Sequence, residues 1–307
     1  MSAFTRALPT VAGLCVLASC SGDDGNQLVL NRRPDFLKST IVSTTYDGTT
    51  NDLLTGGLGK SGLAGAAPQP AIPTSPTVAE LRTLAIYSNY RALVDITAAG
   101  GYGRLYGPNV DVNGTPTSSD GKIAGEEHLA YADDGSNAQN VTLMVQIPTT
   151  LNPEAACIVS ATSSGSRGVY GAIATAGEWG LKHGCAVAYA DKGTGNGAHD
   201  LAANAVNNML GTRVSAASAG TESQFTASLS GADLAAFNAS FPNRWAFKHA
   251  HSQQNPEKDW GRDTLRAIRF AFYMLNQKFG SVSGVSYQKI NPANTIVIAS
   301  SASNGAG

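Results

Sequence analysis

The stretch Thr295-Ile296-Val297-Ile298-Ala299-Ser300-Ser301-Ala302-Ser303-Asn304-Gly305 indicates the fold class of this chain. Its first six residues form the most β-branched run present and predict a buried strand. Ser303 follows in a turn of small residues, with Ser301 two positions before it and Gly305 two positions after it. A sharp strand-to-helix turn that exposes a nucleophilic serine needs small residues there, because its backbone crowds the neighbouring elements. We therefore predict that Ser303 is a catalytic nucleophile; the alternative is an ordinary glycine-rich turn.

The segments before this strand alternate between helix and strand patterns. Apolar residues at helical spacing predict a helix over residues 263–279. Earlier, residues 141–147 alternate like a half-buried strand, 156–161 form a continuous apolar run, and a helix over 172–183 leads to a third strand at 185–190. This alternation predicts an α/β fold with a mostly parallel sheet. With the serine turn it favours an α/β-hydrolase-type sheet, incomplete because the chain ends at the nucleophile elbow.

Composition divides the chain into three parts. Residues 1–20 are predicted to be a signal peptide, and 21–85 form an irregular segment, rich in glycine and proline, that ends in a helix predicted from residue 78 to 87. Residues 86–307 are then the N-terminal part of an α/β-hydrolase domain. Within this part, residues 99–140 are rich in Gly, Asn, Asp and Ser, and we expect long loops there.

The N-terminus predicts export. One positive charge in residues 1–6 precedes a short apolar stretch and the small residues Leu17-Ala18-Ser19-Cys20, the pattern of a secretory signal. The last four residues also resemble a bacterial lipobox, in which Cys20 would carry a lipid; the alternative is a plain cleaved signal. We expect an extracellular or periplasmic protein, or an outer-membrane lipoprotein, that meets a membrane only through a lipid on Cys20.

Charge and cysteine content narrow the choice of partners. The formal net charge of −1 leaves no basic stripe, so we expect no nucleic-acid partner. Charged residues make up 14% of the chain, below the roughly 25% of typical soluble domains, which favours export. Cys157 and Cys185 lie in strand-like runs and could pair if their strands are neighbours; two free buried thiols are the alternative.

An acyl-transfer site also needs N–H donors for the oxyanion. The backbone N–H of Asn304, directly after the nucleophile, is the first candidate. The second donor in this fold comes from the loop after an earlier strand, here residues 162–168, and we predict Ser163 and Ser164. The small residues of this loop let its backbone approach a ligand; an ordinary solvated loop is the alternative.

The histidines of the chain do not complete this site. His199 and Asp200 follow a glycine-rich turn without the Walker spacing, and we expect structural roles for both; the alternative is that they line the site at the carboxyl edge of the sheet. His249 and His251 form an H-x-H pair with no Cys, Asp or Glu cluster beside it, so we predict neither a metal site nor any cofactor. Because the chain order in this fold is serine, acid, histidine, the triad acid and His are expected after residue 307. A serine without a base is a poor nucleophile, so we expect this polypeptide alone to be inactive.

Three stretches are distinctive enough to indicate a family. They are Thr45-Tyr46-Asp47-Gly48 with residues 51–59, Tyr189-Ala190-Asp191-Lys192-Gly193-Thr194-Gly195 with residues 197–200, and the Ser-x-Ser-Asn-Gly turn around Ser303. On these stretches the chain resembles the 3-hydroxybutyrate oligomer hydrolase family over essentially all of its mature length. Its layout is more distantly similar to that of tannases and feruloyl esterases. The resemblance implies hydrolysis of short (R)-3-hydroxybutyrate oligomers, especially dimers, with Ser303 as the elbow serine. Members of the family are considerably longer than this chain.

Two other functions remain open from the residues. The first is an esterase on the same scaffold that acts on aromatic esters, as tannases and feruloyl esterases do. The second is a non-enzymatic exported lipoprotein or carbohydrate-binding module with glycine-rich loops. In the esterase interpretations the partner is a small-molecule ester, whereas in the last interpretation Ser303 has no catalytic role.

Overall fold

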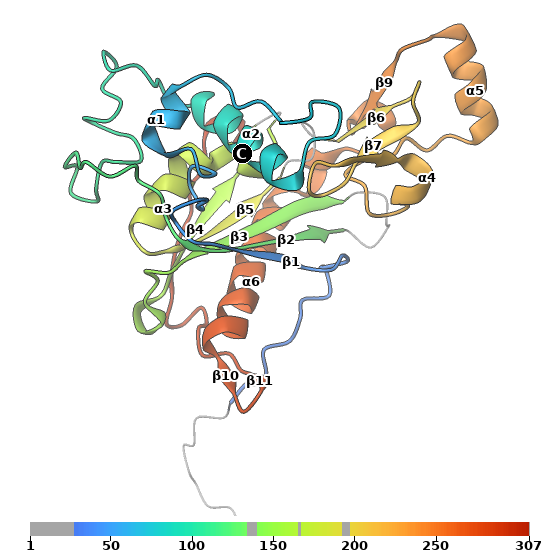
Figure 1. Ribbon diagram of the computed structural model, residues 1–307. Helices are drawn as coiled ribbons and strands as arrows, with labels where there is room; N and C mark the ends of the chain where they lie inside the picture. Colours follow the sequence, from blue (N-terminus) through green and yellow to red (C-terminus); the bar gives the residue numbers. More distant parts are fainter. Residues whose placement is uncertain (1–27, 134–139, 165–166, 192–196, 307) are drawn as a thin grey trace, which may run out of the picture.

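The computed structural model describes residues 28–133, 140–164, 167–191 and 197–306 (Figure 1). The signal segment predicted over residues 1–20, including Cys20, lies outside these ranges. No helix of the described residues is long and apolar enough to cross a membrane.

A six-stranded sheet forms the centre of the molecule. From one edge to the other its strands are β1 (Val42–Tyr46), β2 (Gly125–Ala132), β3 (Val141–Pro148), β5 (Ala186–Ala190), β4 (Cys157–Thr162) and β12 (Ile296–Ile298). Strands β5, β4 and β12 are parallel to one another, whereas the β1–β2, β2–β3 and β3–β5 pairs are antiparallel. The sheet is therefore mixed rather than mostly parallel. Strands β2 and β3 are antiparallel neighbours with eight residues between them in the sequence, fewer than the dozen or more that a crossover between parallel neighbours needs.

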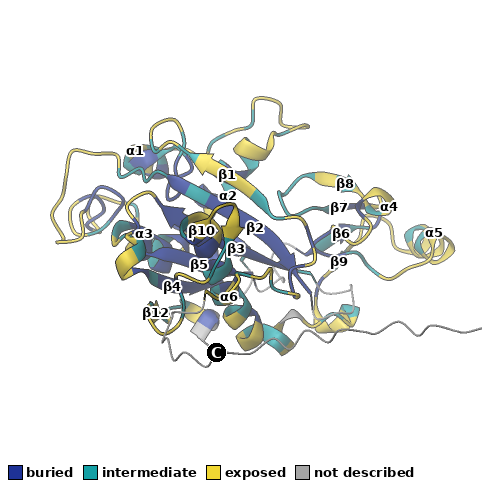
Figure 2. Ribbon diagram, turned by 90° about the horizontal axis from the view of Figure 1, so that it is seen from below, coloured by how far each residue is buried: buried dark blue, intermediate teal, exposed yellow. Residues whose placement is uncertain are grey.

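Helices cover both faces of this sheet (Figures 1 and 2). On one face lies α6 (Trp260–Phe279), whose Phe270 and Leu275 pack with Leu143 and Val145 of β3. The other face carries α1 (Gly59–Ala64), α2 (Val78–Arg91) and α3 (Glu178–Lys182). Because side chains alternate along a strand, neighbouring residues of β3 point to opposite faces of the sheet. Leu143 and Val145 pack against α6, whereas Met144 packs on the α2 side. The central strands are consequently buried on both faces. This corrects the prediction for residues 141–147, which alternate like a half-buried strand but are all buried in β3.

A second, smaller sheet forms an arm between β5 and α6 in the sequence. Its order is β8 (Arg213–Ser215), β7 (Ala205–Asn207), β6 (Ala198–Asp200) and β9 (Trp245–Phe247), and every neighbouring pair is antiparallel. The arm also carries α4 (Ala216–Ala219) and α5 (Gly231–Ser240), and it projects from one side of the central sheet (Figure 1). No residue of α5 is buried, so this helix rests on little of the molecule.

Short elements complete the described fold. The hairpin after α6 consists of β10 (Ser281–Val282) and β11 (Val285–Ser286). The remaining helical turns are η1 (Pro153–Ala155), η2 (Val169–Ala172), η3 (Ile173–Gly177), η4 (Ala250–Ser252), η5 (Pro256–Asp259) and η6 (Ser303–Ala306). The helix predicted over residues 172–183 is therefore divided into η2, η3 and α3.

Two strands of the central sheet were not predicted from the sequence, and both come from parts expected to be irregular. Strand β1 belongs to the 21–85 segment and pairs with β2, which lies in the 99–140 region. Helix α2 runs to Arg91, so a boundary at residue 85 falls inside it. Strand β2 escapes a hydrophobicity pattern because its sequence is Gly-Glu-Glu-His-Leu-Ala-Tyr-Ala, and yet Glu127 is buried. The N-terminal segment is thus an integral part of the main fold.

Candidate active site

The predicted nucleophile lies at a strained turn after the edge strand β12. The prediction that this strand is buried is wrong for the described fold: Ile296 is 69% and Val297 is 40% exposed, because β12 pairs with β4 on one side and lies at the edge of the sheet. Residues 296–298 pair in parallel with residues 157–159 of β4, and a further bridge joins Ser301 to Thr162. Ser303 then begins the helical turn η6 with a φ of 55° and is exposed. A positive φ is uncommon for a residue other than glycine, and such strain concentrates at functional sites. The structure therefore presents Ser303 to solvent on a sharp strand-to-helix turn.

Gly305 shows why the turn needs small residues. A Cβ atom at this position would lie 2.9 Å from the carbonyl oxygen of Thr162 and 3.0 Å from that of Ser163. It would also lie 3.3 Å from the Cβ atom of Ser301. Any side chain at Gly305 would have to displace backbone atoms at the end of β4. The glycine thus brings the Ser303 turn directly against the start of the predicted oxyanion loop.

The two serines proposed as oxyanion donors, Ser163 and Ser164, differ in whether their backbone N–H is already hydrogen-bonded. The N–H of Ser163 donates to the carbonyl of Ala190 at 3.0 Å and so continues the β4–β5 ladder. Its hydroxyl donates to the carbonyl of Arg167 at 2.8 Å. This corrects the prediction for Ser163, because its N–H is not available to a substrate. Ser164 is also buried, and its N–H has no partner among the residues described, so it remains the candidate from this loop. The backbone of Asn304 follows Ser303 within η6.

The first turn of α6 lies beside the same region, which the sequence did not indicate. The Thr264 hydroxyl is 3.0 Å from that of Thr162, next to Ser163. One residue earlier, the buried carboxylate of Asp263 accepts a 2.8 Å hydrogen bond from Arg266. Burial raises the pKa of Asp263 even though Arg266 opposes the rise. A helix pattern alone carries no signal for such a residue, because its burial depends on the sheet beneath it.

The five histidines of the chain are all among the described residues, and their contacts lie elsewhere. His199 is buried in the arm, where its Nε2 lies 3.0 Å from Asn204 Oδ1 and its Nδ1 accepts from the Ala227 N–H at 3.2 Å. The remaining four contact Ser43, the Trp179 carbonyl or each other: His128, His183, His249 and His251. Asp200 forms an ion pair with Arg213 across the small sheet. No described histidine is bonded to Ser303.

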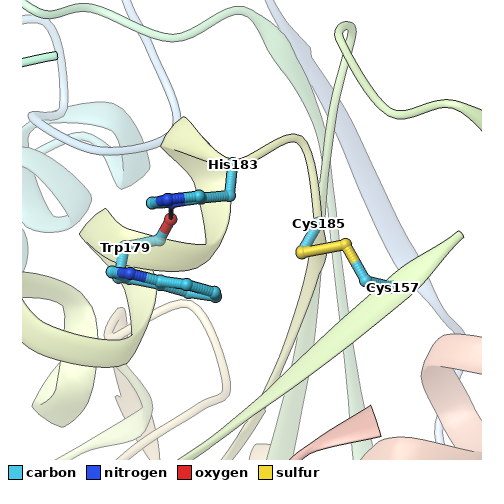
Figure 3. Close-up of a disulfide and its surroundings, with 4 residues drawn as sticks. All are labelled: Cys157, Trp179, His183 and Cys185. Atoms are coloured by element: carbon cyan, nitrogen blue, oxygen red, sulfur yellow. Dashed lines mark hydrogen bonds between the residues drawn. A yellow bond between two sulfur atoms is a disulfide. The ribbon is translucent and has the colours of Figure 1, made fainter. Parts of the chain in front are cut away.

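Cys157 and Cys185 form a disulfide between neighbouring strands (Figure 3). Their Cα atoms are 4.8 Å apart, and the parallel register pairs the following residues, Ile158 and Ala186. The alternative of two free thiols is thereby excluded in this structure. Among the described residues, no group of three or more His, Cys, Asp or Glu side chains is arranged to hold a metal ion.

The described residues thus form a sheet with helices on both faces and an exposed serine at a strained turn after its edge strand β12. Residues 16–307 match the family model described as 3HB-oligomer hydrolase (3HBOH), and the chain belongs to this family.

Its curated relatives are similar over almost the whole chain. The D-(-)-3-hydroxybutyrate oligomer hydrolase of Polaromonas sp. (strain JS666) is 59% identical over 306 residues, which is 99% of this chain and 43% of that protein. The enzyme of the same name from Albidiferax ferrireducens is 59% identical over 299 residues, 96% of this chain and 42% of that protein. The chain therefore spans less than half the length of these relatives. No solved structure matches it significantly.

Proposed function

We propose that the complete protein hydrolyses short oligomers of (R)-3-hydroxybutyrate, with Ser303 as its nucleophile. The assignment of Ser303 as the nucleophile rests on its positive φ in an exposed turn. The absence of a side chain at Gly305 lets this turn pack against the end of β4. The substrate class rests on family membership and on the names of relatives that are 59% identical. We further propose that the sheet is the first part of an α/β-hydrolase sheet, since β12 leads into the serine turn and lies parallel to β4.

In the proposed reaction, Ser303 Oγ attacks the ester carbonyl and the serine proton passes to a base. The backbone N–H groups of Asn304 and Ser164 stabilise the negative charge that develops on the carbonyl oxygen. The C–O bond to the leaving alcohol then breaks, and the alcohol takes up a proton as the acyl-enzyme forms. Water attacks this ester in turn, which releases the hydroxy acid and restores the serine. The chemistry requires no cofactor.

The base is proposed to come from the longer polypeptide. Every histidine of this chain lies among the described residues, and none is bonded to Ser303. A serine hydroxyl reacts slowly unless a neighbouring group accepts its proton. We therefore expect the 307-residue polypeptide to be inactive and the complete protein to be active.

We also propose that the protein is exported. The disulfide between Cys157 and Cys185 supports this location, because such bonds persist mainly in oxidising compartments. The lipid on Cys20 remains a separate proposal, which mass spectrometry of the mature N-terminus would test.

Labelling with an organophosphate tests the nucleophile in the complete protein. The label is expected on Ser303, and Ser303→Ala should lower kcat for 3-hydroxybutyrate dimer by at least about 1000-fold. Two matched controls are Ser301→Ala in the same turn and Ser43→Ala, whose serine is 2.8 Å from a His128 nitrogen. Labelling of Ser43 instead, or full activity of Ser303→Ala, would overturn the assignment. Turnover of feruloyl or galloyl esters with no turnover of the dimer would overturn the substrate class.

A further inference from the structure

A cavity of about 670 Å³ lies between the α2 side of the main sheet and the arm. Its walls come from the edge strand β1 and its neighbour β2, from α2 and η2, and from the arm. They are mainly apolar and include Val42, Leu81, Leu129, Val169, Leu210 and Trp245. A mainly apolar cavity of this size between two structural units is typical of small-molecule sites.

Two of the three charged residues that line the cavity neutralise each other. The guanidinium of Arg82 forms two hydrogen bonds with the Glu127 carboxylate, at 2.8 and 2.9 Å, and Tyr170 donates a third at 2.8 Å. Burial opposes ionisation of Glu127, but the adjacent Arg82 outweighs it and holds the pKa of the carboxyl below its ordinary value. This part of the cavity therefore offers a ligand no net charge.

The third charged residue, Arg213 of β8, is accessible. Its side chain is 49% exposed, and its guanidinium lies 5.6 Å from the centre of the Trp245 ring, another lining residue. Among the described residues its charge partner is Asp200, which receives one of its N–H groups. A guanidinium has five N–H donors in a planar fork, so Arg213 retains donors for a second carboxylate.

The cavity and the serine turn lie on different sides of η2: the cavity is lined by β1 and β2, whereas Ser303 follows β12 at the edge of the sheet opposite β1. Val169 and Tyr170 of η2 line the cavity, while a Cβ on Gly171 in the same helical turn would lie 2.5 Å from Ser163 Oγ. Ser163 in turn has its carbonyl oxygen 3.0 Å from the Cβ position of Gly305, in the Ser303 turn. Ser163 therefore packs between η2 and the serine turn, and none of the described residues that line the cavity belongs to that turn.

We propose that this cavity binds a short aliphatic carboxylic acid, with Arg213 pairing with its carboxylate. The apolar walls cover the aliphatic chain of the ligand. Binding at this site is separate from the serine turn and does not rest on the proposed function. Free acids are preferred over their methyl esters, because only the acid supplies the charge that Arg213 pairs with.

Calorimetric titration of the complete protein tests this site. In a Ser303→Ala background, the linear 3-hydroxybutyrate dimer is compared with its methyl ester. Arg213→Gln should raise the Kd of the free acid by at least about tenfold, since hydrogen bonds between charged groups are worth more than neutral ones. The Kd of the methyl ester should change by less than about twofold, because its end carries no charge. An equal change for both ligands, or no binding of the acid to the parent protein, would overturn the proposal.

Two controls separate ligand binding from support of the arm. Arg244→Gln removes the same charge from an exposed position one residue before Trp245, outside the cavity lining. Asp200→Asn breaks the ion pair but leaves Arg213 in place. Both variants should bind the acid within about twofold of the parent, or more tightly for Asp200→Asn, which releases Arg213 from a competing carboxylate. If Asp200→Asn weakens binding as much as Arg213→Gln, Arg213 acts only through the arm and the proposal is wrong.

Failure of this site is distinguishable from failure of the proposed function. Turnover of the dimer by the parent protein, with acid binding unchanged in Arg213→Gln, leaves the hydrolase function standing and overturns the site. Arg213-dependent binding of the acid without turnover of any 3-hydroxybutyrate ester supports the site and overturns the hydrolase function.

Discussion

Arg82 of α2 and Glu127 of β2 form a bidentate ion pair inside the protein, with Nε to Oε1 at 2.8 Å and Nη2 to Oε2 at 2.9 Å. Their side chains are only 7% and 1% exposed. Arg82 also donates to the Asn51 side chain and to the Asp52 carbonyl, each at 3.1 Å. The pair therefore joins the N-terminal segment to the main sheet.

Loss of Arg82 should strongly destabilise the protein. Arg82→Met leaves the buried Glu127 charge without its partner, which typically costs about 3–5 kcal/mol of unfolding free energy. Arg91→Met is the matched control on the same helix, because Arg91 donates to the Leu63 and Gly65 carbonyls and lies partly exposed. Denaturant unfolding of both variants compares the two losses. Similar losses would show that the ion pair has no special role.

The same pair predicts a dependence of stability on pH. The pKa of Glu127 is held below its ordinary value of 4.5, as burial is outweighed by Arg82. A depressed carboxyl pKa contributes stability that is present above the unfolded value and is lost as pH falls through the folded value. Stability should therefore fall on acidification below pH 4.5, and Glu127→Gln should make that fall shallower. Glu154→Gln, at a carboxylate that is 73% exposed, should leave the slope unchanged.

Gly305→Ala tests the packing of the serine turn. The new Cβ would meet two backbone carbonyls at 2.9 and 3.0 Å, so the turn must shift, at a cost of about 1–3 kcal/mol. Because the shift moves Ser303, we expect a fall in kcat of about 100-fold or more. Gly261→Ala near the start of α6 is the control, since its Cβ would meet nothing within 4 Å. Full activity of Gly305→Ala would refute the tight turn as a catalytic requirement.

Removal of the disulfide should lower stability without touching the serine turn. The bond closes a segment of 28 residues between two neighbouring strands, and its loss should cost about 3 kcal/mol. The double variant Cys157→Ala/Cys185→Ala can be compared with the parent by thermal unfolding, with and without a reductant. We expect the reductant to lower the Tm of the parent and to leave that of the double variant unchanged. If the reductant reduces the disulfide of the parent, as shown by thiol labelling, and the Tm of the parent does not change, the disulfide does not stabilise the protein.

Local sequence was enough to predict the elements whose own residues show a clear helical or strand periodicity. The strand at 141–147 and the helix at 263–279 are found as β3 and α6, each slightly longer than predicted. Both carry enough apolar residues at one period to indicate a buried face. The small residues around Ser303 likewise predicted a sharp turn, and the Gly305 contacts explain them.

Strands β1 and β2 could not be predicted in this way. Glu127 is acceptable in a buried strand only because Arg82, 45 residues away in the sequence, lies against it. The distinctive residues 51–59 likewise acquire their meaning from the fold. Asp52 is fully buried and accepts N–H groups from Leu54 and Thr55 nearby and from Ile123 of a distant segment. These family-specific residues therefore have structural roles.

The sequence by itself determined the family, the helix α6, the strands β3, β4 and β5, and the small-residue turn at Ser303, because these depend on neighbours along the chain. Only the tertiary structure decided the pairing of Cys157 with Cys185 and the use of the Ser163 N–H by Ala190. It also decided the burial of Glu127 and the cavity beside Arg213. Each of these depends on the register between segments distant in sequence, and local patterns carry no information on which distant group a donor, thiol or charge will meet.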